Sequence, residues 1–146
     1  MNFWDSSAIV ALLVQQPGSS AAGQALAEDD EMVVWWGTRL ECAAALFRLI
    51  RGEAISVDDG KRALTGLSAL ASAWAEVDPS ATVRERAQLL VAKHPLKAAD
   101  ALQLAAAILA LSPGRQEDGF VCLDRQLSSA ARAERLHVVP TRLSHR

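Results

Sequence analysis

The chain has 146 residues, of which 51% are hydrophobic and 22% are charged, and its 17 acidic and 15 basic side chains give a net charge of −2. This length and composition predict one globular domain, residues 1–146, and exclude a disordered chain. The small negative charge excludes a general attraction to nucleic acid or anionic membrane, so any such binding requires a local basic patch or a metal ion.

In chain order, short β-branched or aromatic runs alternate with helical segments. The expected elements are a strand over 2–5, a helix from Ser6 or Ser7 to about 15, a helix over 19–27, a strand over 32–36, a helix over 38–51, a helix over 56–74, a short strand around 77, a helix from Ser80 or Thr82 to 93, a helix over 97–111, a strand over 119–123, a helix to about 135 and a strand over 138–139. The alternation predicts an α/β sandwich with a parallel sheet and helices on both faces.

Two features indicate the compartment. The first residues lack the basic segment and cleavage site of a secretion signal, and no uncharged apolar stretch reaches the ~20 residues that span a bilayer. Cys42 and Cys122 lie in apolar segments and form neither a metal-ligand spacing nor a disulfide framework. We therefore expect a cytoplasmic protein with no membrane contact and with two buried, reduced thiols.

Four carboxylates stand in otherwise apolar segments: Asp5, Glu41, Asp100 and Asp124. Asp5 is the only charged residue among the first twenty-seven, and Asp100 is the only charge between Lys97 and Arg115. No Lys or Arg lies near Asp5 in the sequence to offset the cost of burying its ionised carboxylate. Asp5 and Asp124 also follow predicted strands, and parallel sheets carry their sites at the carboxyl ends of strands.

Each carboxylate also has a simpler structural interpretation. Asp5 and Asp124 are good helix N-caps, although Ser6 and Ser7 are available to cap the first helix. Thr38 and Glu41 have the spacing of a capping box. Asp100 in a first helical turn complements the helix dipole, and Asp124 is adjacent to a possible surface partner, Arg125.

Considered together, the four carboxylates predict a cation site. Converging carboxylates repel one another unless a cation binds, and Mg²⁺ or Mn²⁺ is the hard cation that oxygen ligands select. Zinc is not expected, because the histidines are scattered and no Cys/His spacing is present. Such a site supports hydrolytic phosphoryl transfer, in which the metal lowers the pKa of a water molecule and neutralises phosphate charge.

The order and spacing of four blocks resemble the PIN-domain ribonucleases, and among them the VapC-like toxins of bacterial toxin–antitoxin pairs. The blocks begin at Asp5-Ser6-Ser7-Ala8, at Thr38-x-x-Glu41, at Leu96-x-x-Ala99-Asp100-Ala101 and at Phe120-Val121-Cys122-Leu123-Asp124. The resemblance covers essentially the whole chain. It implies a single PIN-like domain, a three-layer sandwich whose central parallel sheet has about five strands.

The resemblance also implies the chemistry. Asp5, Glu41 and Asp100 would surround Mg²⁺ or Mn²⁺ with Asp124 as the fourth member, and the protein would be a metal-dependent endoribonuclease. It implies a homodimer and a small antitoxin protein that occludes the site. Ser7 and Thr38 are candidate residues for orienting the carboxylates. One position departs from the family pattern, because Cys122 stands where Thr or Ser is common, and this departure makes Asp124 the least secure member.

RNA binding by an acidic protein requires local cations. The candidates are Arg39, Arg48, Arg51, Lys61, Arg62 and Lys97. Trp4 and Trp35 lie in predicted strands and are expected in the core, whereas Trp36 and Trp74 lie at element ends, where an interface is an alternative.

Three other functions fit the sequence less well. A haloacid-dehalogenase-type phosphatase requires a second Asp two residues after the first, where this chain has Ser7. A phosphoacceptor receiver requires paired acids near the first strand and a Lys after the last, and neither is evident. A catalytically weak PIN-like module that binds RNA or protein would be expected to lose one or more acids, yet all four remain.

Overall fold

The computed structural model describes residues 1–115 and 117–141, and within them the chain forms five strands and seven helices. The strands are β1 (Asn2–Trp4), β2 (Met32–Trp35), β3 (Ala75–Val77), β4 (Gly119–Val121) and β5 (His137–Val139). The helices are α1 (Ser6–Leu13), α2 (Ser19–Glu28), α3 (Thr38–Arg51), α4 (Val57–Ala73), α5 (Ala81–Lys93), α6 (Ala98–Ala110) and α7 (Arg125–Ala133). The predicted elements are all present.

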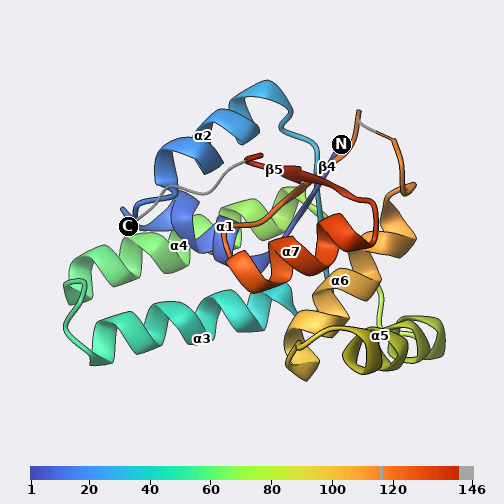
Figure 1. Cartoon of the computed structure of the whole chain (residues 1–146). Coiled ribbons are helices and arrows are strands. Elements are labelled where there is room, and N and C mark those ends of the chain that lie inside the picture. The colour runs from blue at the N-terminus through green and yellow to red at the C-terminus, as the bar shows by residue number, and fades with distance from the viewer. Residues whose placement is uncertain (116, 142–146) are drawn as a thin grey trace.

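The strands form one parallel sheet in the order β3-β2-β1-β4-β5, with β1 at its centre. The expected three-layer α/β sandwich with a five-stranded parallel sheet is therefore confirmed (Figure 1). From β1 the chain proceeds to β2 on one side, and from β4 it proceeds to β5 on the other. The carboxyl ends of β1 and β4 thus form the topological switch point, where such sheets place their sites.

Two hydrophobic clusters hold the layers together, because successive strand residues point to opposite faces of the sheet. Phe3 and Phe120 pack against the face covered by α5, α6 and α7, and their rings meet edge-on at 5.8 Å. Trp4 and Val121 pack on the opposite face against α1, α3 and α4. All four side chains are fully buried, so this alternation fixes which way each strand faces.

The tryptophans divide between core and surface. Trp4 and Trp35 are buried as expected. Trp74 is only 9% exposed, and its Nε1 donates to Glu76 at 3.0 Å, so the interface alternative for Trp74 is wrong. Trp36 is 56% exposed and is the tryptophan available to a partner.

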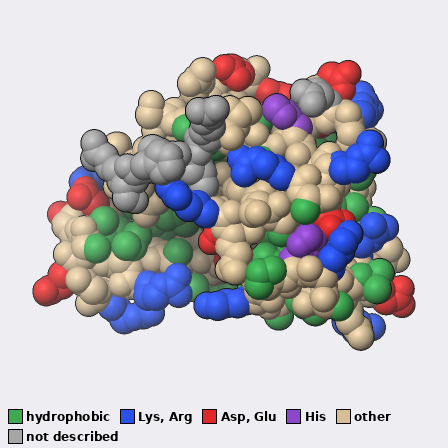
Figure 2. Space-filling model, in the orientation of Figure 1, with side chains coloured by type: hydrophobic (Ala, Val, Ile, Leu, Met, Phe, Trp, Pro, Cys, Tyr) green, Lys and Arg blue, Asp and Glu red, His purple; other side chains and the backbone are tan. Residues whose placement is uncertain are grey.

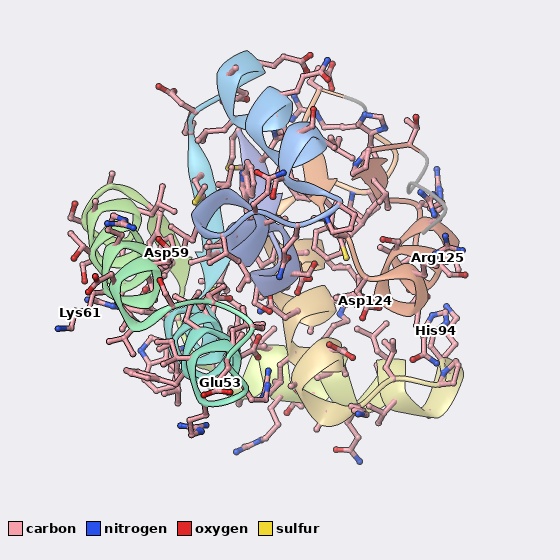
Figure 3. The ribbon with its side chains drawn as sticks, turned by 90° about the vertical axis from the view of Figure 1, so that its left-hand side faces the viewer. Glu53, Asp59, Lys61, His94, Asp124 and Arg125 are labelled. Carbon is pink, nitrogen blue, oxygen red and sulfur yellow. The ribbon has the colours of Figure 1, made fainter. Side chains whose placement is uncertain are left out.

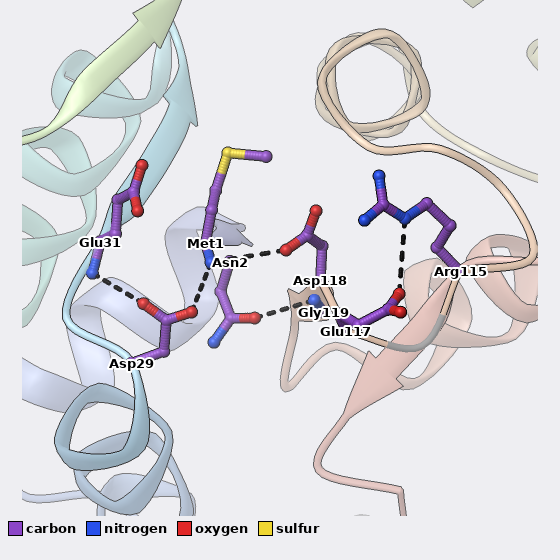
Figure 4. A network of polar contacts seen from close by, with 8 residues as sticks. All are labelled: Met1, Asn2, Asp29, Glu31, Arg115, Glu117, Asp118 and Gly119. Atoms are coloured by element: carbon purple, nitrogen blue, oxygen red, sulfur yellow. Dashed lines mark hydrogen bonds and ion pairs between the residues drawn. The ribbon is translucent and has the colours of Figure 1, made fainter.

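A polar network joins the amino ends of β1 and β4, at the edge of the sheet away from the switch point (Figure 4). Asn2 is buried, and its Oδ1 accepts a hydrogen bond from the Gly119 amide at 2.8 Å. The amino group of Met1 contacts the carboxylates of Asp29 and Asp118. Across the described ranges, no helix is both long and apolar enough to span a membrane.

Candidate active site

Asp5 follows β1 and is itself the N-cap of α1, whereas the sequence favoured Ser6 or Ser7 for this role. Its Oδ2 accepts hydrogen bonds from the Ser7 amide at 3.1 Å and the Ser7 hydroxyl at 2.5 Å. The carboxyl is 3% exposed, and burial raises its pKa to about 6. The Ser7 hydrogen bonds oppose this rise, whereas the charges of Glu41 and Asp100 add to it. Asp5 is therefore electrostatically coupled to both.

Glu41 lies in the first turn of α3 and faces α6. Gly37 precedes this helix without a side-chain cap, so the capping-box interpretation of Thr38 and Glu41 is wrong. Instead, the Gln103 amide donates at 2.8 Å both to Oε2 of Glu41 and to the hydroxyl of Thr38. Burial raises the pKa of Glu41, hydrogen bonds from Gln103 and Ser6 lower it, and the charge of Asp100 raises it further.

Asp100 and Asp124 complete the set. Asp100 lies in the first turn of α6, where burial and then the charge of Asp124 raise its pKa against the opposing charge of Lys97. Asp124 follows β4 by three residues, and its Oδ1 accepts from the Leu127 amide at 2.8 Å, so it caps α7. Its cap role and its place in the site coexist, because only one of its oxygens is engaged by this bond.

The four carboxylates line one cavity of about 1170 Å³ at the carboxyl ends of the strands. Arg48 and Lys97 also line it, whereas the other four predicted cations, Arg39, Arg51, Lys61 and Arg62, do not. Arg125 lines it too and was not among the predicted cations. In Figure 3, Asp124 and Arg125 lie at the start of α7, and Lys61 lies across the molecule on α4. The structure thus brings all four predicted acids to one cavity, together with two of the six predicted basic side chains.

Both cysteines lie beside Asp5. The sulfur of Cys122 lies 3.6 Å from Oδ2 of Asp5 and 3.5 Å from the backbone oxygen of Asp124, so its single proton has an acceptor on either of two acids of the set. The Cys42 thiol donates to the backbone oxygen of Ser6 at 3.8 Å. Burial, followed by the charge of Asp5, raises the pKa of both thiols, that of Cys42 to about 12. Both side chains are buried thiols, as expected, and neither is a nucleophile at neutral pH.

The donor set suits a hard divalent cation. None of Asp5, Glu41 and Asp100 forms a salt bridge with another described residue, and each has a raised pKa, as expected for buried carboxylates that lie near other acids. Oxygen ligands of this kind favour Mg²⁺ or Mn²⁺. In the part of the chain described, no three acidic, histidine or cysteine side chains form a compact metal-binding group, so the carboxylates share a cavity and do not form a preformed cage.

Sequence reasoning missed Gln103. It is fully buried and supports both Thr38 and Glu41, while its own Oε1 has no hydrogen-bond partner among the described residues. A signal was present, because Gln103 is the one polar side chain besides Asp100 in the sequence of α6. It stands three residues after Asp100, so the two share one side of the helix.

A model of the PIN domain family matches residues 3–133 of the chain. The search of curated proteins found no match to this chain.

Solved structures with the same fold include bacterial toxins. One is the toxin VapC20 of Mycobacterium tuberculosis, described as cleaving the sarcin–ricin loop, at 19% identity and a TM-score of 0.68, covering 89% of this chain and 95% of that one. Another is a toxin–antitoxin complex from Klebsiella pneumoniae, at 17% identity and a TM-score of 0.63, covering 99% and 100%. A third is VapBC2 of Rickettsia felis bound to a DNA fragment from its promoter, at 13% identity and a TM-score of 0.63, covering 94% and 96%. At these identities the likeness shows the fold.

Proposed function

The chain belongs to the PIN-domain family, and from this premise we propose that it is a metal-dependent endoribonuclease, the toxin of a VapBC-like toxin–antitoxin pair. The observation that supports the proposal most strongly is the convergence of Asp5, Glu41, Asp100 and Asp124 on one cavity. A single capping carboxylate has a structural explanation, but four carboxylates on one cavity do not, when burial and the charge of another member of the set raise the pKa of Asp5, Glu41 and Asp100.

Asp5, Glu41, Asp100 and Asp124 would hold Mg²⁺ or Mn²⁺. When bound, such a cation lowers the pKa of a water molecule and neutralises charge that develops on the phosphate. The protein positions the ligands: Ser7 fixes Asp5, Gln103 fixes Glu41, and the α7 cap fixes Asp124. Fixed acceptors need little reorganisation during the reaction, and this is the main contribution a protein makes to such catalysis.

The same cavity offers a means of binding RNA. Arg48 and Lys97 place positive charge on its wall, where the phosphates that flank the scissile bond would lie. Its volume of about 1170 Å³ exceeds that of a typical small-molecule pocket, as expected for an extended substrate. The substrate class we propose is single-stranded or looped RNA.

The partners we propose are a small antitoxin protein and a second copy of this chain. Two of the similar structures are named as toxin–antitoxin assemblies. This chain has apolar side chains available for such contacts at the start and on one side of α3, since Trp36, Leu40 and Phe47 are exposed. An RNase toxin of this kind would act in the cytoplasm.

The test is RNA cleavage by antitoxin-free protein with Mg²⁺ or Mn²⁺ and with EDTA. Asp5→Asn and Asp100→Asn should each abolish cleavage. Asp59→Asn is the matched control, because Asp59 is an exposed carboxylate on α4 whose ion pair with Arg62 contributes little. Cleavage that survives both site variants would indicate a contaminating nuclease, and cleavage that Asp59→Asn also abolishes would show that the losses are not specific to the cavity.

RNA binding without cleavage in any of these conditions would favour the alternative, a PIN-like module that binds RNA or protein. Circular dichroism of each variant separates loss of fold from loss of chemistry.

A further inference from the structure

A second groove, of about 370 Å³, lies beside the edge strand β5. Four basic or titratable side chains line it: Arg115, Arg132, Arg135 and His137. On the face of the molecule that carries α7 and β5, Figure 2 shows several Lys and Arg side chains and two histidines. This concentration is unexpected in a chain with more acidic than basic residues.

Two consecutive residues just after β5 line the two hollows. Pro140 lines the active-site cavity, and the next residue, Thr141, lines the groove. Arg132 is held beside these residues, because its Nη2 donates to the backbone oxygen of Thr141 at 3.0 Å. The guanidinium of Arg132 therefore lies beside the residue that follows Pro140 of the cavity lining.

One exposed face of α7 extends from the active-site cavity to the β5 groove. Arg125, Ser129 and Arg132 are exposed and stand at helical spacing i, i+4 and i+7. Arg125 lines the cavity and Arg132 lines the groove. Their Cα atoms are about 10 Å apart along the helix, which corresponds to about three nucleotides of a stacked strand at ~3.4 Å each.

No acidic residue interrupts this face. α7 itself contains no Asp or Glu, and Glu134, just after the helix, contacts Lys93 and His94 of the neighbouring segment. At the far end of the groove Arg115 forms an ion pair with Glu117 at 3.4 Å, so its charge is partly compensated. Arg132 and Arg135 are therefore the cations on which phosphate binding would mainly depend.

We infer that RNA extending from the active-site cavity follows α7 into the β5 groove, where Arg132 and Arg135 bind its phosphates. The inference rests on the proposed ribonuclease function and adds to it a direction for the substrate. Guanidinium groups suit phosphate oxygens because each presents several donors in one plane. Contacts of this kind position a nucleic acid without reading its sequence.

The experiment measures binding by fluorescence anisotropy, in Asp100→Asn protein so that the RNA stays intact. The probes are fluorescein-labelled oligouridines of about 20 and about five nucleotides, in salt from about 50 to 200 mM. Arg132→Gln with Arg135→Gln removes two charges from the groove and keeps side-chain length. Lys61→Gln with Arg86→Gln is the control, because it removes two charges from exposed positions of α4 and α5 that line neither the cavity nor the groove.

The groove variant should flatten the plot of log affinity against log salt for the long probe by about 1.4, since each lost contact to a single strand contributes about 0.7. The short probe and the control variant should show no such change. In the opposite direction, Ser129→Lys adds a charge to the exposed face of α7 and should strengthen binding of the long probe. This second variant tests the path even if the groove variant does not fold.

Wild-type-like binding of the long probe by both the groove variant and Ser129→Lys would overturn the inference and leave the proposed function intact. A labelled DNA duplex is measured in parallel, and loss of its affinity in the groove variant with unchanged affinity for RNA would also overturn the inference, because the groove would then serve a different ligand. If protein with the native groove binds neither RNA probe, the proposed function and the inference both fail.

Discussion

Asp5 combines two roles that conflict energetically. As the cap of α1 it is well suited to its position, yet its carboxyl is 3% exposed and faces the charges of Glu41 and Asp100. Burial raises its pKa from 3.8 to about 6. At neutral pH the metal-free protein therefore holds an ionised group that is less stable in the fold than in the unfolded chain.

Asp5→Asn should stabilise the metal-free protein. The pKa of Asp5 is 3.8 in the unfolded chain and about 6 in the folded protein. The protonated carboxyl therefore makes its full contribution to the free energy of unfolding below pH 3.8, and this contribution is lost as the pH rises through about 6. Asn caps a helix as well as Asp does and carries no charge, so the variant should gain on the order of 2–3 kcal/mol at pH 7. Urea unfolding in EDTA at pH 7 and pH 4 measures this gain, which should nearly vanish at pH 4. If the variant were more stable than the wild type by the same amount at pH 7 and at pH 4, the charge of Asp5 would not be the cause of the gain.

Gln103 supports Glu41 without facing the solvent itself. Gln103→Leu should weaken Mn²⁺ binding about 10- to 100-fold, the range usual for residues that hold metal ligands in place. The fold should change by less than about 1 kcal/mol, because leucine also removes an unpaired buried amide oxygen. Calorimetric titration with Mn²⁺ measures the affinity without RNA. Thr38→Val, which leaves the bond to Glu41 in place, should have a smaller effect, and an equal effect would contradict the role given to Gln103.

At the scale of elements, α7 is attached at both ends. Its first residue follows the cap Asp124, and after its last residue Glu134 accepts from Nε2 of His94 at 2.7 Å and Nζ of Lys93 at 2.9 Å, both at the end of α5. Burial acts against ionisation of Glu134, but these hydrogen bonds outweigh it and lower its pKa. The contact fixes the helix that carries both Asp124 and the arginines of the proposed RNA path.

Glu134→Gln should destabilise the protein by about 1–2 kcal/mol, since it removes the charge of a carboxylate whose bond to His94 is largely shielded from solvent, whereas its bond to the exposed Lys93 contributes less. The pKa of Glu134 is lower in the folded protein than its ordinary value of 4.5. The contribution of Glu134 to stability is therefore fully present above pH 4.5 and is lost as the pH falls through the lower pKa of the folded protein. The difference between variant and wild type in urea unfolding should therefore be large at pH 7 and small near pH 3. Glu85→Gln, at an exposed position of α5, is the control and should change little.

The elements could be predicted from sequence because each has a strong local signal. Short apolar runs mark the strands, and Pro17-Gly18 and Pro113-Gly114 mark where helices end. The caps were less predictable. Thr38 and Glu41 have the capping-box spacing, yet Gln103, 65 residues from Thr38 and 62 from Glu41, takes both as partners. A local pattern cannot show which long-range partner competes for the same atoms.

The four candidate acids could be recognised from sequence for a similar reason. A charge in an apolar run has few structural explanations, so Asp5 and Asp100 were evident from composition alone. Cations on amphipathic helices carry no such signal, because most of them are simply solvated. Only the fold separates Arg48 and Lys97, which line the cavity, from Arg39 and Lys61, which do not.

At the scale of the whole molecule, one sheet with a separate hydrophobic cluster on each face positions the site. Asp5 and Asp124 extend from the two neighbouring strands β1 and β4, while Glu41 and Asp100 come from helices on opposite faces. The electrostatic repulsion among these four carboxylates therefore acts between the sheet and the helices on its two faces. A cation that binds all four would therefore stabilise the molecule as a whole and not just one loop.

Mn²⁺ or Mg²⁺ should thus raise the melting temperature of the protein, and EDTA should reverse the change. At about a hundredfold excess over the dissociation constant, the gain is about 2.7 kcal/mol, or several degrees for a domain of this size. Asp5→Asn combined with Asp100→Asn should abolish the shift, because the charges that attract the cation are gone, whereas Asp59→Asn on α4 should keep it. Differential scanning calorimetry measures this shift without RNA or antitoxin. A shift that persists in the double variant would place the cation elsewhere and separate the metal from the four carboxylates.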